Sequence, residues 1–274
     1  MSQRKSDTLK TYADLMEASG LLMEAALYGQ EETHPDVLTY DSREVKANTM
    51  FICKGAAFKE TYLVSAIEKG AVLYISERKY ETGKDVPFLL VSDIRKAMAI
   101  LANAFYGSPW KELTVVGVGG TKGKSTSAYY MKAIVDDYME ETGKPESAVI
   151  SSIDIYDGKS RVESHITTPE AVELQRHFRN AADCGITFAE MEVSSQALKY
   201  NRSMGCSLML GFSSISRRII SARSSIRTLR IIYIQDADVR TDRPCGGESG
   251  CGFCGPDSGG SSGGWRCDDD QPER

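Results

Sequence analysis

The chain has 274 residues, of which 41% are hydrophobic and 26% charged, with a formal net charge of −5. This length suits one large domain or two ordinary ones, and the mild negative charge excludes a general nucleic-acid binder. No apolar run approaches the roughly 18 residues that a membrane span needs. The first 20 residues lack the pattern of a signal peptide. We therefore expect a cytoplasmic protein without a nucleic-acid or membrane partner.

The N-terminal half predicts alternating strands and helices. Residues 37–53 indicate a short strand, a turn and a second strand. Further elements are expected as helices over 62–70 and 94–107, closed by Gly70 and Gly107, and strands over 71–77 and 88–92. Ser108-Pro109 then marks a turn and a domain boundary.

The pattern continues beyond this boundary. Residues 113–118 predict a buried strand, and a helix is expected from the following loop to about Thr142. Residues 147–153 and 186–195 predict strands that flank an amphipathic helix over 169–185, with Pro169 in its first turn. Strands that alternate with helices indicate an α/β fold with a parallel sheet and right-handed crossovers.

The loop between the strand and the helix, GVGGTKGKST, runs from Gly117 to Thr126. A strand that feeds a glycine-rich turn into a helix presents backbone N–H groups to phosphate oxygens. Lys124 can reach the β- and γ-phosphates, and the Ser125 hydroxyl can ligate Mg²⁺. The strict Walker pattern would place its first glycine at Val118, whereas this chain has Gly117 one residue earlier.

The displaced glycine matches G-x-x-G-T-x-G-K-S/T and resembles the ATP loop of the Mur ligase family, which the folylpolyglutamate synthetases share. Three further segments resemble the subfamily of UDP-N-acetylmuramoyl-L-alanyl-D-glutamate ligases (MurE type). These are Tyr40-Asp41-Ser42-Arg43, Thr167-Thr168-Pro169, and Glu192-Val193-Ser194-Ser195 with Arg202 further on. The resemblance covers about residues 38–202. The family usually has Asn where Lys122 stands.

The resemblance implies a ligase of peptidoglycan synthesis, and hence of cell-wall biogenesis, cell shape and cell division. ATP would phosphorylate the free carboxylate of a UDP-MurNAc-dipeptide, and the amine of a third amino acid would attack the acyl phosphate. By position, Lys124 and Glu192 would be catalytic, and Ser125 and Glu192 would hold Mg²⁺. ATP would bind to Gly120, Thr121, Lys122, Gly123, Lys124, Ser125 and Thr126, and the UDP-sugar-peptide to Ser42, Thr167, Thr168, Ser194 and Arg202. We expect a monomer.

Each motif also has a simpler structural interpretation. Glu192 could be a solvated carboxylate at a strand end, Thr168 a helix cap, and Asp41-Ser42-Arg43 an ordinary turn. His165 is expected on the surface, and Cys53 and Cys184 in the core. A folylpolyglutamate-type ligase is an alternative that the Asp-Ser-Arg segment disfavours. A short nucleotide-binding protein whose tail binds a metal or a partner is another.

The composition changes near residue 205. Residues 1–202 contain 16 Lys, 8 Arg and 2 Cys, whereas residues 203–274 contain no Lys, 9 Arg and 5 Cys. The last 38 residues have almost no apolar periodicity, so they cannot offset the entropy of folding. Cys245, Cys251, Cys254 and Cys267 fit no common zinc spacing.

Codons written for the tail and read in shifted frames can encode family-like EDH and VNLD segments. We therefore predict a frame disruption near residue 205 and a second one near residue 233. The expected organisation is a mixed UDP-sugar-binding domain over 1–109, an incomplete parallel-sheet ATPase domain over 110–206, and a non-native tail over 207–274. The chain as given is expected not to ligate. Which amino acid the enzyme adds is not encoded in these segments.

Overall fold

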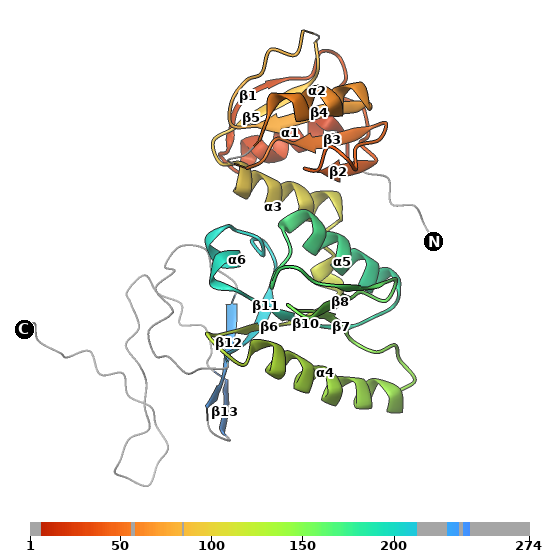
Figure 1. Ribbon diagram of the computed structural model, residues 1–274, viewed down its shortest axis with the longest axis vertical. Coiled ribbons are helices and arrows are strands. Elements are labelled where there is room, and N and C mark those ends of the chain that lie inside the picture. Colours follow the sequence, from red (N-terminus) through yellow and green to blue (C-terminus); the bar gives the residue numbers. More distant parts are fainter. Residues whose placement is uncertain (1–6, 56–57, 84, 213–228, 236–237, 242–274) are drawn as a thin grey trace, which may run out of the picture.

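The computed structural model describes residues 7–55, 58–83, 85–212, 229–235 and 238–241, with side chains placed as far as Met209. Two α/β regions follow one another along the chain, and each is built on its own sheet (Figure 1). In this part of the chain, no helix combines the length and apolar character that crossing a bilayer requires.

The N-terminal domain contains a sheet in the order β1-β5-β4-β3-β2. Its strands are β1 (Leu22–Ala26), β2 (Val37–Thr39), β3 (Thr49–Ile52), β4 (Ala71–Ser76) and β5 (Phe88–Val91). Strands β2 to β5 are parallel, whereas β1 is antiparallel to β5. The expected parallel strands are confirmed, and β1 makes the sheet mixed.

Helices cover both faces of this sheet because its strands are apolar on both sides. Met50 and Ile52 of β3 belong to a core cluster that also contains residues of α1 (Leu9–Ala18) and α3 (Ile94–Phe105). Phe51, which points to the opposite face, packs in a second cluster with Leu63 of α2 (Glu60–Glu68). Sequence analysis assigned no element to α1 or β1.

The central sheet has the order β13-β12-β11-β6-β10-β7-β8-β9. Its strands are β6 (Thr114–Gly119), β7 (Ala148–Ile150), β8 (Asp154–Tyr156), β9 (Arg161–Glu163), β10 (Phe188–Glu192), β11 (Leu208–Phe212), β12 (Leu229–Gln235) and β13 (Asp238–Thr241). Strands β12, β11, β6, β10 and β7 are parallel, and the sequence predicts this for β6, β7 and β10. Strands β8, β9 and β13 are antiparallel, so this sheet is also mixed.

Helix α4 (Lys124–Glu141) lies on one side of the central sheet, and α5 (Ala171–Asp183) and α6 (Ser195–Lys199) lie on the other (Figure 1). A short 3-10 helix, η1 (Pro109–Glu112), leads into β6. The first residues of α5, Ala171 and Val172, are buried in the core cluster of the N-terminal domain. The two domains therefore share part of one hydrophobic core.

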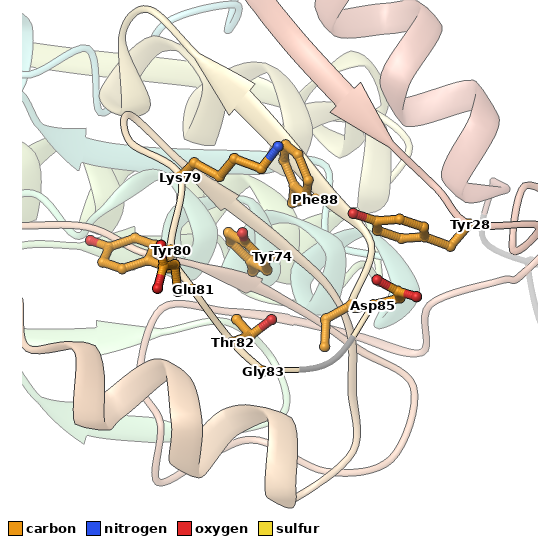
Figure 2. A pocket seen from close by; sticks show the side chains of 10 residues that line it. Tyr28, Tyr74, Lys79, Tyr80, Glu81, Thr82, Gly83, Asp85 and Phe88 are labelled. Carbon is orange, nitrogen blue, oxygen red and sulfur yellow. The ribbon is translucent and has the colours of Figure 1, made fainter.

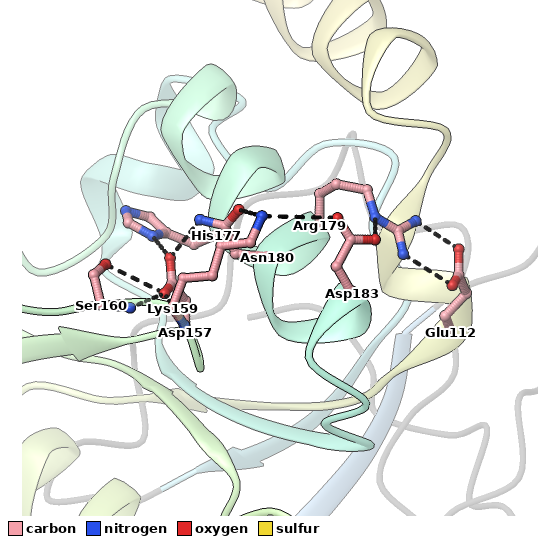
Figure 3. A network of polar contacts seen from close by, with 8 residues as sticks. All are labelled: Glu112, Asp157, Lys159, Ser160, His177, Arg179, Asn180 and Asp183. Carbon is pink, nitrogen blue, oxygen red and sulfur yellow. Dashed lines mark hydrogen bonds and ion pairs between the residues drawn. The ribbon is translucent and has the colours of Figure 1, made fainter. Parts of the chain in front are cut away.

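The β8–β9 hairpin is tied to α5 by a buried carboxylate (Figure 3). Asp157, at the hairpin turn, accepts hydrogen bonds from the backbone N–H groups of Lys159 (3.1 Å) and Ser160 (2.9 Å). Its other oxygen lies 2.7 Å from His177 Nδ1 and accepts a bond from Asn180 Nδ2 at 2.7 Å. Burial lowers the pKa of His177, and the pair with Asp157 only partly opposes this. The network anchors the segment that leads to Thr167 and Thr168.

One sequence-based expectation about α5 needs correction. Pro169 lies before the N-cap residue Glu170, not in the first turn, because α5 begins only at Ala171. Strands β11, β12 and β13 fall within residues 207–274, and the non-native character of this tail stays a prediction. The tail cysteines Cys245, Cys251, Cys254 and Cys267 lie outside the described residues.

Candidate functional site

The glycine-rich loop forms the predicted turn between a strand and a helix. Strand β6 ends at Gly119, and Gly120 and Gly123 have φ values of +136° and +77°. Residues with a Cβ rarely adopt these values, so glycine is required for the turn. Helix α4 begins at Lys124, whose Nζ donates to the Gly120 carbonyl at 3.1 Å. The lysine therefore folds back across the loop, over the N-terminus of α4.

Glu192 lies at the carboxyl end of β10, opposite Val118 of β6. It is only 1% exposed, so it is not the solvated strand-end carboxylate of the simpler interpretation. Its Oε1 accepts hydrogen bonds from the backbone N–H of Ser152 (2.9 Å) and from Ser152 Oγ (3.1 Å). Ser152 Oγ also lies 3.2 Å from Ser125 Oγ. The two predicted metal ligands, Ser125 and Glu192, are thus brought together through Ser152.

The donors at this point suit a hard divalent cation. Two hydroxyl oxygens and one carboxylate meet at the start of α4, and Mg²⁺ binds few protein oxygens when phosphate and water complete its shell. Among the described residues, no group of three or more His, Cys, Asp or Glu side chains could hold a metal. The set therefore fits Mg²⁺ held jointly with a bound phosphate, and not a closed structural metal site.

The Thr167-Thr168-Pro169 segment lies directly beside Glu192. The fully buried Thr168 hydroxyl donates to the Glu192 carbonyl at 2.7 Å and accepts from the Ser194 backbone N–H at 3.2 Å. Thr168 is therefore not the cap of α5, because its hydroxyl is committed to the strand end. Ser194 Oγ caps α6 by accepting from Ala197 N at 3.1 Å. Thr167 is half-buried and Thr121 is exposed, and His165 is on the surface as expected.

Arg202 is held by two acceptors from the segment that precedes α5. Its Nη1 donates to the Thr168 carbonyl at 3.0 Å, and its Nη2 donates to Glu170 Oε1 at 2.7 Å. The Nε atom is buried, and no described residue forms a hydrogen bond with it. Burial alone would raise the pKa of Glu170, but Lys54 and Arg202 more than reverse this and lower it. Arg202, Thr168 and Ser194 thus form one connected group.

Ser42 belongs to the N-terminal domain, on the turn after β2. Its carbonyl accepts from Lys69 Nζ at 2.6 Å. Asp41 forms an ion pair with Arg43, which lowers the pKa of Asp41. Tyr40 of the same turn lies beside Glu173 of α5, and the ammonium of Lys54, also in the N-terminal domain, lies 4.4 Å from its ring centre. Tyr40 therefore connects this turn to the Thr168 segment. The Ser42 carbonyl contacts only Lys69 of the N-terminal domain among the described residues.

A separate pocket of about 510 Å³ lies in the N-terminal domain (Figure 2). Its walls include the aromatic side chains of Tyr28, Tyr74, Tyr80 and Phe88, with Lys79 beside Phe88. None of the side chains that line it is a predicted site residue. The pocket is therefore distinct from the group around Ser125 and Glu192.

The sequence alone does not point to Ser152, Lys54 or Glu170. Ser152 carries a usable signal, because it lies near the carboxyl end of the strand predicted over residues 147–153, which is expected to run parallel to the predicted strand that contains Glu192. Lys54 and Glu170 are 116 positions apart and carry no local signal. The core prediction is confirmed for Cys53, which is buried, whereas Cys184 is only partly buried.

Residues 118–214 match the family model described as the Mur ligase middle domain. The chain belongs to the Mur ligase family. It is 41% identical over 210 residues to a UDP-N-acetylmuramyl-tripeptide synthetase of Lactobacillus acidophilus, covering 76% of this chain and 39% of that protein. A UDP-N-acetylmuramoyl-L-alanyl-D-glutamate–L-lysine ligase of Enterococcus faecalis is 44% identical over 175 residues, which cover 64% of this chain and 33% of that protein. This Mur ligase chain spans about two fifths or less of the length of these relatives.

Solved structures support the same fold. A UDP-N-acetylmuramoyl-L-alanyl-D-glutamate–2,6-diaminopimelate ligase aligns with a TM-score of 0.56 at 22% identity, covering 76% of this chain and 41% of that one. MurF from Acinetobacter baumannii aligns with a TM-score of 0.51 at 16% identity and the same coverage. At these identities the likeness establishes the Mur ligase architecture.

Proposed function

We propose that this chain provides the UDP-sugar-binding domain and the nucleotide loop of an ATP-dependent ligase that adds the third amino acid to UDP-MurNAc-L-Ala-D-Glu. The observation that supports this best is the connected group Ser125–Ser152–Glu192 beside the loop. It joins the predicted phosphate-binding loop to Thr168, Ser194 and Arg202, which the family resemblance assigns to the sugar-peptide.

The loop would bind and orient the triphosphate. Backbone N–H groups of Gly120–Thr126 and the N-terminus of α4 attract phosphate oxygens. Lys124, now within 3.1 Å of the Gly120 carbonyl, can exchange this acceptor for a phosphate oxygen and stabilise the transferred group. Exposed Thr121, Lys122 and Thr126 would flank the nucleotide.

Ser125 and Glu192 would hold Mg²⁺, which when bound neutralises phosphate charge. Ser152 holds the Glu192 carboxylate with two hydrogen bonds to Oε1, and its hydroxyl lies 3.2 Å from Ser125 Oγ. Thr168 donates to the Glu192 carbonyl and thereby sets the strand end against the substrate segment. Positioning of this kind supplies much of the rate enhancement in phosphoryl transfer.

The dipeptide carboxylate of the substrate would be phosphorylated, and the amine of the incoming amino acid would displace the phosphate to form the amide. Ser42 would contact the uridine end, and Thr167, Thr168, Ser194 and Arg202 the sugar-peptide. Charged donors such as Arg202 suit carboxylate and phosphate groups. Such UDP-linked substrates are consistent with a cytoplasmic monomer.

Isothermal titration calorimetry tests this proposal with the 274-residue chain. A non-hydrolysable ATP analogue is expected to bind to the wild-type chain in the presence of Mg²⁺. Its Kd should be about tenfold higher for the Ser152→Ala variant. UDP-MurNAc-L-Ala-D-Glu is expected to bind at a separate site with a stoichiometry of one. Failure of both ligands to bind the folded chain would contradict the proposed function.

We further propose that the change of composition near residue 205 records a disrupted reading frame and that the chain as given does not ligate. The family match runs to residue 214, and β11 ends at Phe212. Sequencing of the coding DNA over codons 200–274 tests the first point. Amide synthesis that depends on ATP and on the purified chain would contradict the second.

A further inference from the structure

A buried group of charged side chains joins the two domains between the predicted ligand segments. Lys54 follows β3 of the N-terminal domain, and its Nζ lies 2.6 Å from Glu170 Oε2 in the central domain. Glu170 Oε1 accepts from Arg202 Nη2 at 2.7 Å. The three side chains are only 11–13% exposed. We call Tyr40, Lys54, Glu170, Glu173 and Arg202 the interdomain cluster.

The remaining members enclose Lys54 from both domains. Its ammonium lies 4.4 Å from the centre of the Tyr40 ring. Burial raises the pKa of Glu173, and contacts with Tyr40 and Lys54 only partly oppose this. Glu173 Oε2 has no hydrogen-bond partner among the residues that the structure describes. Glu170 is thus the acceptor that Lys54 and Arg202 share. Its single negative charge faces two positive charges.

The connections of the cluster run to both halves of the proposed substrate site. On one side Tyr40 is two residues from Ser42, and on the other Glu170 is two residues from Thr168. Arg202 also donates to the Thr168 carbonyl at 3.0 Å. A change at Lys54 is therefore transmitted to Arg202 and Thr168 through Glu170, although Lys54 forms its ion pair with neither.

We propose that Lys54 is a positioning residue for the UDP-sugar-peptide: through Glu170 it holds Arg202 and the Thr167–Thr168 segment in register with the Tyr40–Ser42 turn. This inference rests on the proposed function and deepens it, because it names what aligns the two halves of one binding site. Apolar packing of Ala171 and Val172 in the core of the N-terminal domain holds the two domains together. The Lys54–Glu170 ion pair aligns the polar residues at the same interface. The nucleotide loop meets this connection only at its far end, through Thr168, Glu192 and Ser152, so we expect its affinity for ATP to depend on Lys54 much less than the affinity for the UDP-sugar-peptide does.

The test compares Lys54→Met with Lys79→Met. Lys79 is a close match within the same domain, with its Nζ 2.6 Å from Glu24 and 4.7 Å from the Phe88 ring centre, but its pair is exposed and joins no other domain. Calorimetry on the 274-residue chain measures the Kd of UDP-MurNAc-L-Ala-D-Glu and the Kd of an ATP analogue with Mg²⁺. Circular dichroism confirms that each variant is folded.

Lys54→Met is expected to raise the Kd of the UDP-sugar-peptide about tenfold and to change the Kd of the ATP analogue less than about twofold. Lys54→Arg should restore most of the affinity, and Lys79→Met should change neither value. Should Lys54→Met not fold, Glu170→Gln takes its place, because the amide keeps an acceptor for Arg202 and removes the charge that Lys54 needs.

Three results would overturn the proposal, and they separate it from the proposed function. A folded variant with the wild-type Kd for the UDP-sugar-peptide overturns the role of Lys54 alone. Equal losses for both ligands show a general structural role and also overturn it. Absence of UDP-sugar-peptide binding by the wild-type chain overturns the sugar-peptide part of the proposed function, and the positioning role with it.

Discussion

The nucleotide loop and the interdomain cluster are built in opposite ways. The loop is local: within Gly117–Thr126 the glycines set the turn, and Lys124 bonds to a carbonyl four residues before it. The cluster is assembled from three distant parts of the chain, because Lys54, Glu170 and Arg202 meet only in the folded protein. The geometry of a local site is set by backbone conformation. The geometry of an assembled site depends on ion pairs between buried charged side chains.

This difference governs how each region responds to a substitution. Breaking a buried ion pair leaves an uncompensated charge in a poorly solvated place, so the free energy of unfolding falls. Removing a partly exposed loop side chain leaves no such charge, so the effect should appear in ligand binding. The following predictions test this contrast, beginning with the largest expected effect.

Glu170→Ala should lower the free energy of unfolding by about 3 kcal/mol, since it leaves both Lys54 and Arg202 without their shared acceptor. Glu24→Ala, which breaks the exposed pair with Lys79, should cost less than about 1 kcal/mol. Urea denaturation measures both values. Equal losses in the two variants would remove the distinction between the cluster and an ordinary surface pair.

Glu190 allows a test of how a buried carboxyl group without an ion-pair partner among the described residues makes stability depend on pH. Burial raises the pKa of this carboxyl group to about 7, with Ser147 and Lys132 offsetting only part of the shift. Neither of its oxygens has a hydrogen-bond partner within the described part of the chain, and the Ser147 hydroxyl donates to Asp136 instead, at 2.8 Å. Around it, the Lys132 ammonium is occupied by Asp136, Glu146 and the Ser147 carbonyl.

The folded state binds this proton more tightly than the unfolded state, whose pKa is near the ordinary 4.5. The stabilisation is therefore complete below about pH 4.5 and is lost as the pH rises through about 7. By pH 8 the loss should approach about 3 kcal/mol. Glu190→Gln should show a smaller fall between pH 5 and 8 in urea denaturation. A variant with the wild-type pH slope would show that Glu190 does not titrate in this range.

Lys124→Met should raise the Kd of an ATP analogue about 100-fold, because a hydrogen-bonding charge on the phosphates is lost. The exposed Lys144, just beyond α4, provides the control, and Lys144→Met should bind the analogue normally. Calorimetry measures the affinity, and the unfolding free energy of both variants should remain near the wild-type value. A large loss of stability in Lys124→Met would show that the loop, like the interdomain cluster, contributes to the stability of the whole fold.

Thr168→Val should lower the free energy of unfolding by about 1 kcal/mol, since the buried hydroxyl bridges the Glu192 carbonyl and the Ser194 N–H. Thr187→Val is the control, because its hydroxyl contacts only the weak acceptor Met139 Sδ, at 3.8 Å. Urea denaturation compares the two. If both variants are equally stable, Thr168 does not tie the substrate segment to the strand end.

Most elements follow from local patterns, and the exceptions have physical causes. The sequence predicts Gly70 and Gly107 as helix ends, and both have positive φ. Proline suits a first turn, which favours Pro169 inside α5, but Thr168 is held by the strand end and the helix begins later. The sequence carries no signal for the β8–β9 hairpin, because β9 is exposed at every residue and shows no alternation. Its turn depends on the buried Asp157.

The sequence by itself determined the loop, the succession of strands and helices along the chain and the family, because glycine spacing, apolar runs and short motifs act over a few residues. It also predicts Ser125 and Glu192 as site residues, although not the hydroxyl of Ser152 that connects them. Only the tertiary structure decided that Thr168 supports Glu192 and that Lys54 and Arg202 share Glu170. Such pairings depend on which distant segments the sheets bring together, and charge balance in a buried place cannot be read from neighbours along the chain.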